Sequence, residues 1–178
     1  MNRRKEHFFK IYDLKQFIPK NFCLNCQGCC RYANIRSKWS PFLLNEEIEL
    51  FKKKKIPVSL RPHTKKIKLI RLLSASREVV CPFLEVFSNR CKIYNLRPFD
   101  CRLYPFLLRK IKNKIYLAID TNCPYVQKTF RQEEFNNYVD RLARFLKQPK
   151  IKKLIQCNPR IIGFFPEKEV VNLLCLSF

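Results

Sequence analysis

The sequence has few glycine, histidine and acidic residues, and each of these shortages argues against certain kinds of binding site. Two glycines in 178 residues argue against a glycine-rich loop around a nucleotide phosphate, because such loops need several residues without a side chain. The only histidines, His7 and His63, lie outside the cysteine-rich segments, and the sequence shows no convincing acid–base pair. No run approaches the roughly 18 apolar residues that span a membrane.

Acidic residues are scarce, and the formal net charge is +23, with 37 Lys and Arg against 14 Asp and Glu. A binding surface for nucleic acid or anionic lipid would gather this charge on one face, whereas a compositional bias would scatter it. Basic residues occur from Arg3 to Lys168, so the sequence favours a positive charge that is scattered by compositional bias. Nucleic acid nevertheless stays an alternative partner.

Cysteine is the abundant and informative residue. Four of the ten cysteines, Cys23, Cys26, Cys29 and Cys30, fall within eight residues around Gly28. Cysteines at i, i+3 and i+6 on a tight turn can converge on one ion or cluster, and a glycine lets the chain wrap closely around it. Adjacent side chains point in different directions, so we expect Cys29 and Cys30 to face different partners. Three convergent thiols are too few for a closed site, so further ligands must lie elsewhere.

More thiols follow at Cys81, Cys91, Cys101 and Cys123. Eight cysteines between positions 23 and 123 suffice for two four-thiolate centres, or for one cluster and a structural zinc. Charges interrupt the apolar residues near the N-terminus, which predicts no signal peptide and a cytoplasmic protein. In a reducing compartment, cysteines serve as metal ligands rather than disulfides. We expect Cys157 and Cys175, in apolar surroundings, to be ordinary buried thiols.

The composition predicts a globular α+β protein, a small single domain in which a few helices and short strands or a hairpin surround a multi-cysteine metal centre. Residues 106–111 and 115–119 have the pattern of a β-hairpin. Asn45 predicts a helix start, with an asparagine cap and acids in the first turn. Thr129 opens a second helix that runs to about Lys147 with an apolar stripe.

We predict three regions along the chain. Residues 1–21 form a basic lead-in, 22–148 form the cysteine-cluster metal-binding domain, and 149–178 form a basic and apolar C-terminal extension. Thiolate centres carry net negative charge and need donors around them, so Arg97 and Arg102 are predicted to hydrogen-bond or compensate the bound cofactor, with Arg31 as a weaker candidate.

The cysteine spacing and its surrounding residues resemble a known family. The matching segments are Cys-x-x-Cys-x-x-Cys-Cys at 23–30, Cys81-Pro82-Phe83-Leu84, and Cys-x-Ile-Tyr-x-x-Arg-Pro-x-x-Cys-Arg-x-Tyr-Pro-Phe at 91–106. They are similar to the YkgJ-type cysteine-cluster family, also called the putative zinc- or iron-chelating CxxCxxCC domain, which is related to flagellin lysine N-methylase. The resemblance covers about residues 22–124. It implies a metal or iron-sulfur centre.

The cysteine order favours iron over zinc. Three thiols at Cys-x-x-Cys-x-x-Cys with a distant Cys-Pro are typical of ferredoxin-type [4Fe-4S] ligation, whereas zinc sites more often use paired Cys-x-x-Cys groups. We therefore predict an iron-sulfur cluster, with zinc as the alternative, acting with a redox or protein partner in redox chemistry, electron transfer or metal handling. Two other readings stay open: an enzyme, as an iron-sulfur oxidoreductase or lysine N-methylase relative, and a nucleic-acid-binding module with a structural metal.

Overall fold

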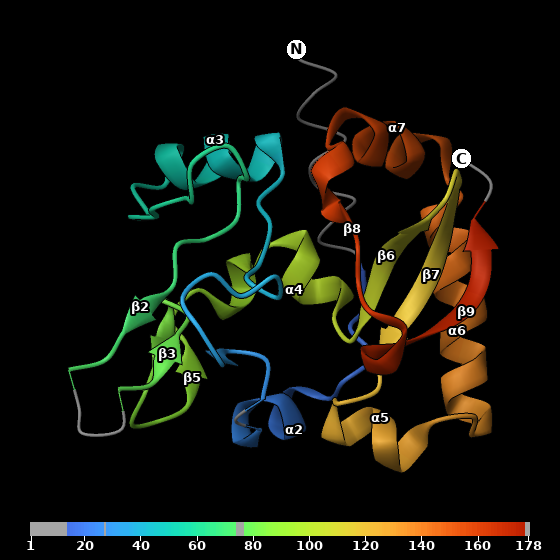
Figure 1. Ribbon diagram of the computed structural model, residues 1–178, viewed down its shortest axis with the longest axis horizontal. Coiled ribbons are helices and arrows are strands. Elements are labelled where there is room, and N and C mark those ends of the chain that lie inside the picture. The colour runs from blue at the N-terminus through green and yellow to red at the C-terminus, as the bar shows by residue number, and fades with distance from the viewer. Residues whose placement is uncertain (1–13, 27, 74–76, 177–178) are drawn as a thin grey trace. The chain divides into compact units, whose positions relative to one another are not determined.

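The computed structural model describes residues 14–26, 28–73 and 77–176, which divide into two compact units (Figure 1). Unit 1 is described over residues 14–18 and 102–176, and unit 2 comprises the described residues of 19–101. Both units mix helices with strands, which confirms the predicted α+β class. Residues 1–13 of the predicted lead-in lie outside the described residues. The predicted boundaries at 21 and 148 stay predictions.

Unit 2 consists of short elements joined by long loops. They are α2 (Lys20–Asn25), β1 (Arg31–Tyr32), α3 (Asn45–Lys53), β2 (Ile70–Arg71), β3 (Val79–Val80), β4 (Leu84–Glu85), β5 (Arg90–Cys91), the 3-10 helix η1 (Tyr94–Leu96) and the start of α4 (Phe99–Leu103). The order β1-β3-β2 makes an antiparallel three-stranded sheet, and β4 pairs with β5 in a second hairpin. The first cysteine group thus joins the later ones through strand pairing.

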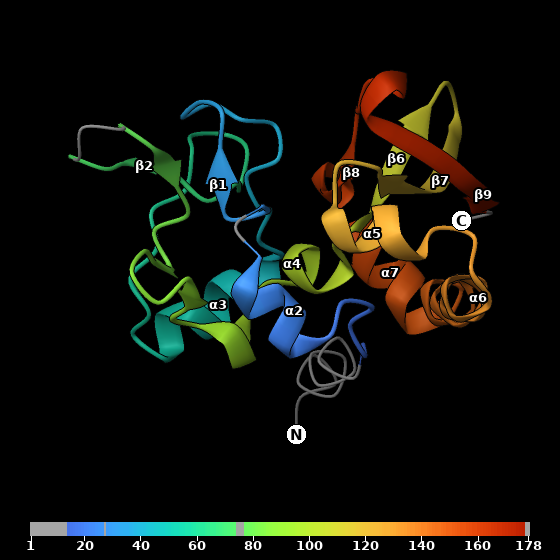
Figure 2. The ribbon, with the colours of Figure 1, turned by 90° about the horizontal axis from the view of Figure 1, so that it is seen from below.

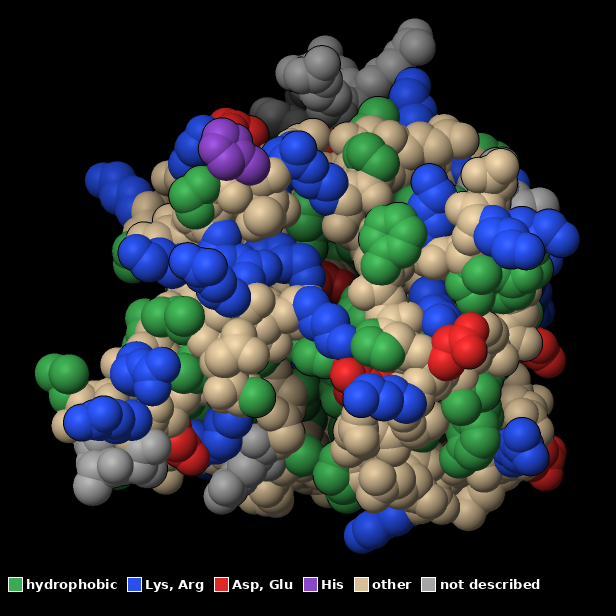
Figure 3. All heavy atoms as spheres, viewed as in Figure 1, with side chains coloured by type: hydrophobic (Ala, Val, Ile, Leu, Met, Phe, Trp, Pro, Cys, Tyr) green, Lys and Arg blue, Asp and Glu red, His purple; other side chains and the backbone are tan. Residues whose placement is uncertain are grey.

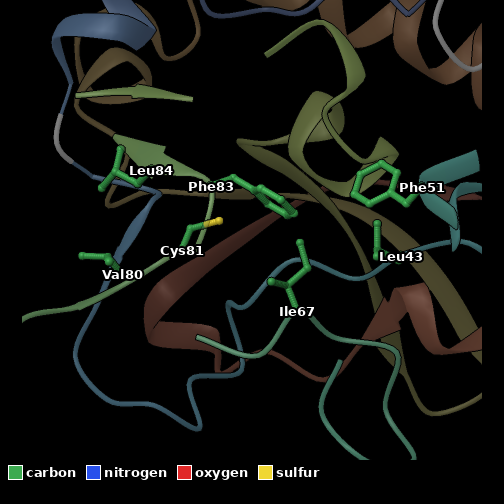
Figure 4. Close-up of a cluster of buried hydrophobic side chains, with 7 residues drawn as sticks. All are labelled: Leu43, Phe51, Ile67, Val80, Cys81, Phe83 and Leu84. Atoms are coloured by element: carbon green, nitrogen blue, oxygen red, sulfur yellow. The ribbon is translucent and has the colours of Figure 1, made fainter. Parts of the chain in front are cut away.

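The hydrophobic core of unit 2 includes one of the predicted ligands. Its fully or nearly buried members are Leu43, Phe51, Ile67, Val80, Cys81, Phe83 and Leu84 (Figure 4). Phe51 meets Phe83 edge to face, with ring centroids 6.0 Å apart. Cys30 and Cys91 are half-buried and pack against this core. Three of the predicted metal ligands therefore lie in or against the hydrophobic core of unit 2.

A buried carboxylate ties α3 to α4 inside unit 2. Glu47 is fully buried. Its Oε2 accepts a hydrogen bond from the backbone N–H of Leu44 at 2.9 Å, and its Oε1 accepts one from the backbone N–H of Phe99 at 2.5 Å. Leu44 occupies the N-cap position and Asn45 is the first residue of the helix, so the predicted asparagine cap is wrong. The Glu47 side chain satisfies the cap N–H instead.

Unit 1 is built on a four-stranded sheet in the order β8-β6-β7-β9 (Figure 1). Its elements are β6 (Phe106–Ile111), β7 (Lys114–Asp120), α5 (Pro124–Thr129), α6 (Glu133–Leu146), α7 (Pro149–Cys157), η2 (Pro159–Ile161), β8 (Ile162–Gly163), η3 (Glu167–Glu169) and β9 (Val170–Leu176). The antiparallel β6–β7 pair, with Phe106 opposite Ile119, confirms the predicted hairpin. Strand β8 joins β6 in parallel, and β9 joins β7 antiparallel.

The helix α6 packs its aromatic face on this sheet. The ring of Phe106 stacks on that of Tyr138 with centroids 5.2 Å apart, and Phe17 meets Phe106 edge to face at 5.6 Å. Figure 2 shows α6 end-on beside α7. The predicted helix start at Thr129 is wrong. Thr129 instead ends α5, and Arg131 has a φ of 63°, in the left-handed region that interrupts a right-handed helix.

In the described part of the chain, no helix is both long and apolar enough to cross a membrane.

Candidate metal centre

Seven of the eight predicted thiols belong to unit 2 and come from four separate parts of it. Cys23 lies in α2, Cys26 ends that helix, Cys29 and Cys30 precede β1, Cys81 follows β3, Cys91 lies in β5 and Cys101 lies in α4. All are free thiols. The eighth, Cys123, is buried at the N-terminus of α5 in unit 1. Its role as a ligand stays a prediction.

Backbone hydrogen bonds hold the cysteine segments against each other. The N–H of Cys81 donates to the carbonyl of Cys30 at 3.0 Å, which extends the β1–β3 pairing by one residue. Cys91 lies opposite Leu84 in the β4–β5 hairpin, and the N–H of Leu84 donates to the Cys81 carbonyl at 3.0 Å. The chain therefore links Cys30, Cys81 and Cys91 through a continuous series of strand contacts.

The side-chain amide of Asn89 hydrogen-bonds the backbone of the first cysteine group. It donates to the carbonyl of Cys26 at 2.7 Å and to that of Leu24 at 3.3 Å. These carbonyls lie at the end of α2, where helical partners are lacking. Asn89 was not predicted from the sequence, because its partners are more than sixty residues away and its neighbours form an ordinary turn.

Cys30 affects the pKa values of several other thiols of unit 2. A hydrogen bond between the Cys29 and Cys30 side chains raises the pKa of Cys29 and lowers that of Cys30. The expectation that these two face different partners stays a prediction. Cys29 is exposed, so we attribute its raised pKa to this bond more than to burial. Burial raises the pKa of Cys81 to about 12 and raises that of Cys101 strongly, and the charge of Cys30 adds to both shifts.

The thiols of unit 2 lie in neighbouring segments, but their sulfur atoms do not converge on one position. Among residues 14–26, 28–73 and 77–176, no three Cys, His, Asp or Glu side chains form a group that could already hold a metal ion. The chemical type of the donors, thiols, nevertheless suits a metal such as zinc or iron. Burial is the main cause of the raised pKa values of Cys23, Cys81 and Cys91, and the charges of neighbouring cysteines add to it. A bound cation favours the thiolate form and lowers these pKa values.

Arg97 lies beside one of the predicted thiols, and its role toward a bound cofactor stays a prediction. Its Nη1 is 4.0 Å from Sγ of Cys23, and its Nε donates to the Tyr94 carbonyl at 2.9 Å. The guanidinium also stacks on the Tyr94 ring, 3.6 Å from its centroid. Arg31 is instead paired with Glu78 at 2.8 Å. Arg102 belongs to unit 1, and its cofactor role stays a prediction.

Tyr32 is a site residue that the sequence analysis missed. It packs against the core that contains Cys81, and its hydroxyl is buried without a hydrogen-bond partner among the described residues. Burial, followed by the charges of Cys81 and Cys30, raises its pKa well above the usual value. A buried hydroxyl without a hydrogen-bond partner costs free energy. The Tyr32 hydroxyl can therefore gain a hydrogen bond from a metal centre that the cysteines hold. Its position two residues after Cys30 was the available signal.

Cys157 and Cys175 are exposed, so the prediction that they are buried is wrong. Cys157 ends α7, whose buried side chains are Ile151, Leu154 and Ile155. Cys175 lies in the edge strand β9, where its side chain points away from the covered face. Their apolar neighbours in the sequence occupy the opposite faces of the same elements. Both thiols lie in unit 1 and provide natural controls for the cysteines of unit 2.

Comparison with known proteins gives one match. No curated protein and no solved structure matches the chain. The model of the CxxCxxCC family, described as "Putative zinc- or iron-chelating domain", matches residues 22–124. This segment is more than half of the chain and contains all eight cysteines that the sequence analysis assigned to metal. The chain therefore belongs to the CxxCxxCC family of putative zinc- or iron-chelating domains.

Proposed function

We propose that this protein binds a metal centre through the thiols of unit 2 and that the centre is an iron-sulfur cluster used for electron transfer, redox chemistry or metal handling. The observation that carries the proposal is the gathering of thiols from four chain segments around Cys30. Soft thiolate donors of this kind bind zinc and iron-sulfur clusters in preference to magnesium or calcium. Metal binding by the family agrees with this donor set.

The arrangement of the donors supports a cluster over zinc. Cys23, Cys26 and Cys29 supply three thiols from one turn, and a distant cysteine such as Cys81, which is followed by a proline, supplies a fourth. When bound, such a cluster takes up and returns a single electron. The protein's contribution is to hold the thiolates and to surround them with donors that stabilise negative charge.

Two residues of unit 2 serve that second purpose in this proposal. Arg97, 4.0 Å from Cys23 Sγ, supplies a positive charge that its stacking on Tyr94 holds in place. Tyr32 supplies a hydroxyl that has no hydrogen-bond partner in the described part of the chain and therefore loses nothing by donating to a sulfur. Hydrogen bonds and charge near the sulfurs also set the reduction potential of a cluster.

Replacing Tyr32 by phenylalanine should have opposite effects on the metal-free and metal-loaded protein. Without metal, the variant loses an unsatisfied buried hydroxyl, so its free energy of unfolding should be unchanged or rise by about 1 kcal/mol. With metal, it loses a donor to sulfur, so metal affinity should fall roughly 10-fold. Denaturant unfolding and chelator competition measure the two effects. Tyr116→Phe in unit 1 is the control, and equal behaviour of both variants would remove Tyr32 from the site.

Purification without oxygen, followed by quantification of iron, zinc and acid-labile sulfide, tests the proposal itself. We expect iron and sulfide in equal amounts, with visible absorption that disappears on exposure to air. Zinc without sulfide would keep the thiolate site but replace the cluster by the alternative. A preparation that holds neither metal, and that takes up neither during reconstitution, contradicts the proposed function.

A further inference from the structure

Three side chains of unit 2, those of Glu78, Arg31 and Asn89, form one series of hydrogen bonds. Arg31 donates through Nη1 to Oε2 of Glu78 at 2.8 Å and through Nη2 to Oδ1 of Asn89 at 3.4 Å. Nδ2 of Asn89 donates in turn to the carbonyl of Cys26 at 2.7 Å and to that of Leu24 at 3.3 Å. The series therefore leads from the residue before β3 to the end of α2.

Each side chain of this series lies close in sequence to a different predicted thiol. Glu78 lies three residues before the cysteine that follows β3, Arg31 directly follows the last cysteine of the first group, and Asn89 lies two residues before the cysteine of β5. Hydrogen bonds from residues outside the ligand set are what orient the ligands of metal sites. This series connects three of the four chain segments that carry the thiols of unit 2.

The part of the first cysteine group in and after α2 lacks the hydrophobic packing that positions later thiols. Cys81 belongs to the core of unit 2, and Cys91 packs against it. In contrast, none of the side chains of α2, all of which the structure describes, is buried, and Cys29 is exposed. The position of α2 therefore depends on directed hydrogen bonds, among them those that Asn89 makes across more than sixty residues.

The backbone and the amide of Asn89 both suit this contact. Its φ of 52° lies in the left-handed region, which asparagine adopts more readily than most residues other than glycine. Its oxygen accepts from a guanidinium while its nitrogen donates to two carbonyls. Glycine shares the backbone preference but has no side chain, and an ionised aspartate has no donor. Asparagine thus combines the conformation with the hydrogen bonds.

The charge of Arg31 is used inside the unit rather than on its surface. On the face that Figure 3 shows, Lys and Arg side chains project from many elements. The Arg31 side chain is only 18% exposed, and its two terminal nitrogens donate to Glu78 and Asn89. A guanidinium is a planar fork that fixes the positions of two acceptors at once. Arg31 therefore turns the Asn89 amide toward the carbonyls at the end of α2.

We propose that Asn89 is a positioning residue of the metal centre. Its amide, oriented by Arg31, holds α2 and the turn after it where the thiols of the first group bind metal together with those of the later segments. Asn89 does not contact the metal and acts through the backbone of Cys26. This inference rests on the proposed metal binding.

Zinc added to the metal-free full chain, in competition with a chelator, measures the contribution of Asn89. Asn89→Gly keeps the left-handed backbone but removes the amide, and Asn89→Asp keeps the size of the side chain but cannot donate. We expect both variants to bind zinc roughly 10-fold more weakly, at the lower end of the range for residues that support metal ligands.

Amide hydrogen exchange of the metal-free protein provides a readout that needs no metal. In both Asn89 variants, residues 20–26 should exchange about 10-fold faster, because this segment loses the hydrogen bonds that hold its end. Residues 79–85 should exchange as before, since hydrophobic packing holds them. Faster exchange of both segments to the same extent would show a general loss of stability and would overturn the positioning role.

Lys112→Gly is the matched control, because Lys112 also has a left-handed φ, 51°, in the turn between β6 and β7 of unit 1. It should change neither zinc affinity nor the exchange of residues 20–26. If both Asn89 variants match the unmodified chain in zinc affinity and exchange, the inference fails while metal binding stands. If the unmodified chain takes up neither zinc nor iron, the proposed function fails, and the exchange rates alone decide whether Asn89 holds the cysteine group.

Discussion

Replacing Cys30 by serine should remove most of the bound metal. Cys30 hydrogen-bonds Cys29, its carbonyl accepts from Cys81, and its charge affects the pKa values of the thiols around it. A serine hydroxyl does not ionise near neutral pH and is a poor ligand for zinc or iron. Loss of an outer partner of a metal ligand costs 10-fold to 100-fold in affinity, so loss of a ligand should cost about 100-fold or more.

The same substitution should lower stability through the lost metal. A ligand that binds only the folded state at 100 times its dissociation constant stabilises the protein by about 2.7 kcal/mol. Thermal unfolding with and without metal measures this difference, which should disappear in Cys30→Ser. Cys175→Ser, at an exposed position of unit 1, should keep both metal and stability. Should Cys30→Ser retain its full metal content, Cys30 is not a ligand.

Replacing Glu47 by alanine should destabilise unit 2 by about 3 kcal/mol, with or without metal. The change leaves the N–H groups of Leu44 and Phe99 without their buried acceptor, and each unsatisfied buried donor costs roughly 1–3 kcal/mol. Because Phe99 begins the helix that carries Cys101, metal binding should weaken as well. Denaturant unfolding of the metal-free protein measures the structural part of the effect alone.

Glu49→Ala provides the comparison on the same helix. Glu49 pairs with Lys52 at 2.9 Å, and both side chains are about 70% exposed, so its loss should change the free energy of unfolding by less than about 0.5 kcal/mol. The two carboxylates are separated by a single residue and differ mainly in burial. Similar stabilities of the two variants would show that the Glu47 hydrogen bonds contribute little.

Local patterns predicted the parts of the fold that depend on local contacts. The hairpin of β6 and β7 and the buried face of α6, which includes Phe135, Tyr138 and Leu142, follow from periodicity in the sequence. The start of α6 was missed because Arg131 adopts a left-handed conformation that its residue type does not indicate. The chain is continuous through α4, so no change in composition marks the division after Cys101.

The sequence identified the thiols of unit 2 as candidate ligands, and their role as ligands stays a prediction, but it did not identify the residues that support them. Cysteine spacing identified the thiols that unit 2 gathers, because that spacing is itself the recognition signal. Glu47 looked like an ordinary acid in the first turn of an exposed helix, and its burial depends on Phe99, which is 52 residues away. Tyr32 and Asn89 likewise act through contacts across the fold. Such contacts leave no periodic trace in a single sequence.

X-ray absorption at the edge of the bound metal tests the central claim most directly, because it reports which atoms surround the metal. With thiolates of unit 2 as ligands, we expect a first shell of sulfur at about 2.3 Å, as for zinc bound by cysteine, and for a cluster an additional iron neighbour beyond it. A first shell made only of nitrogen and oxygen near 2.0–2.1 Å would show that the cysteines do not hold the metal.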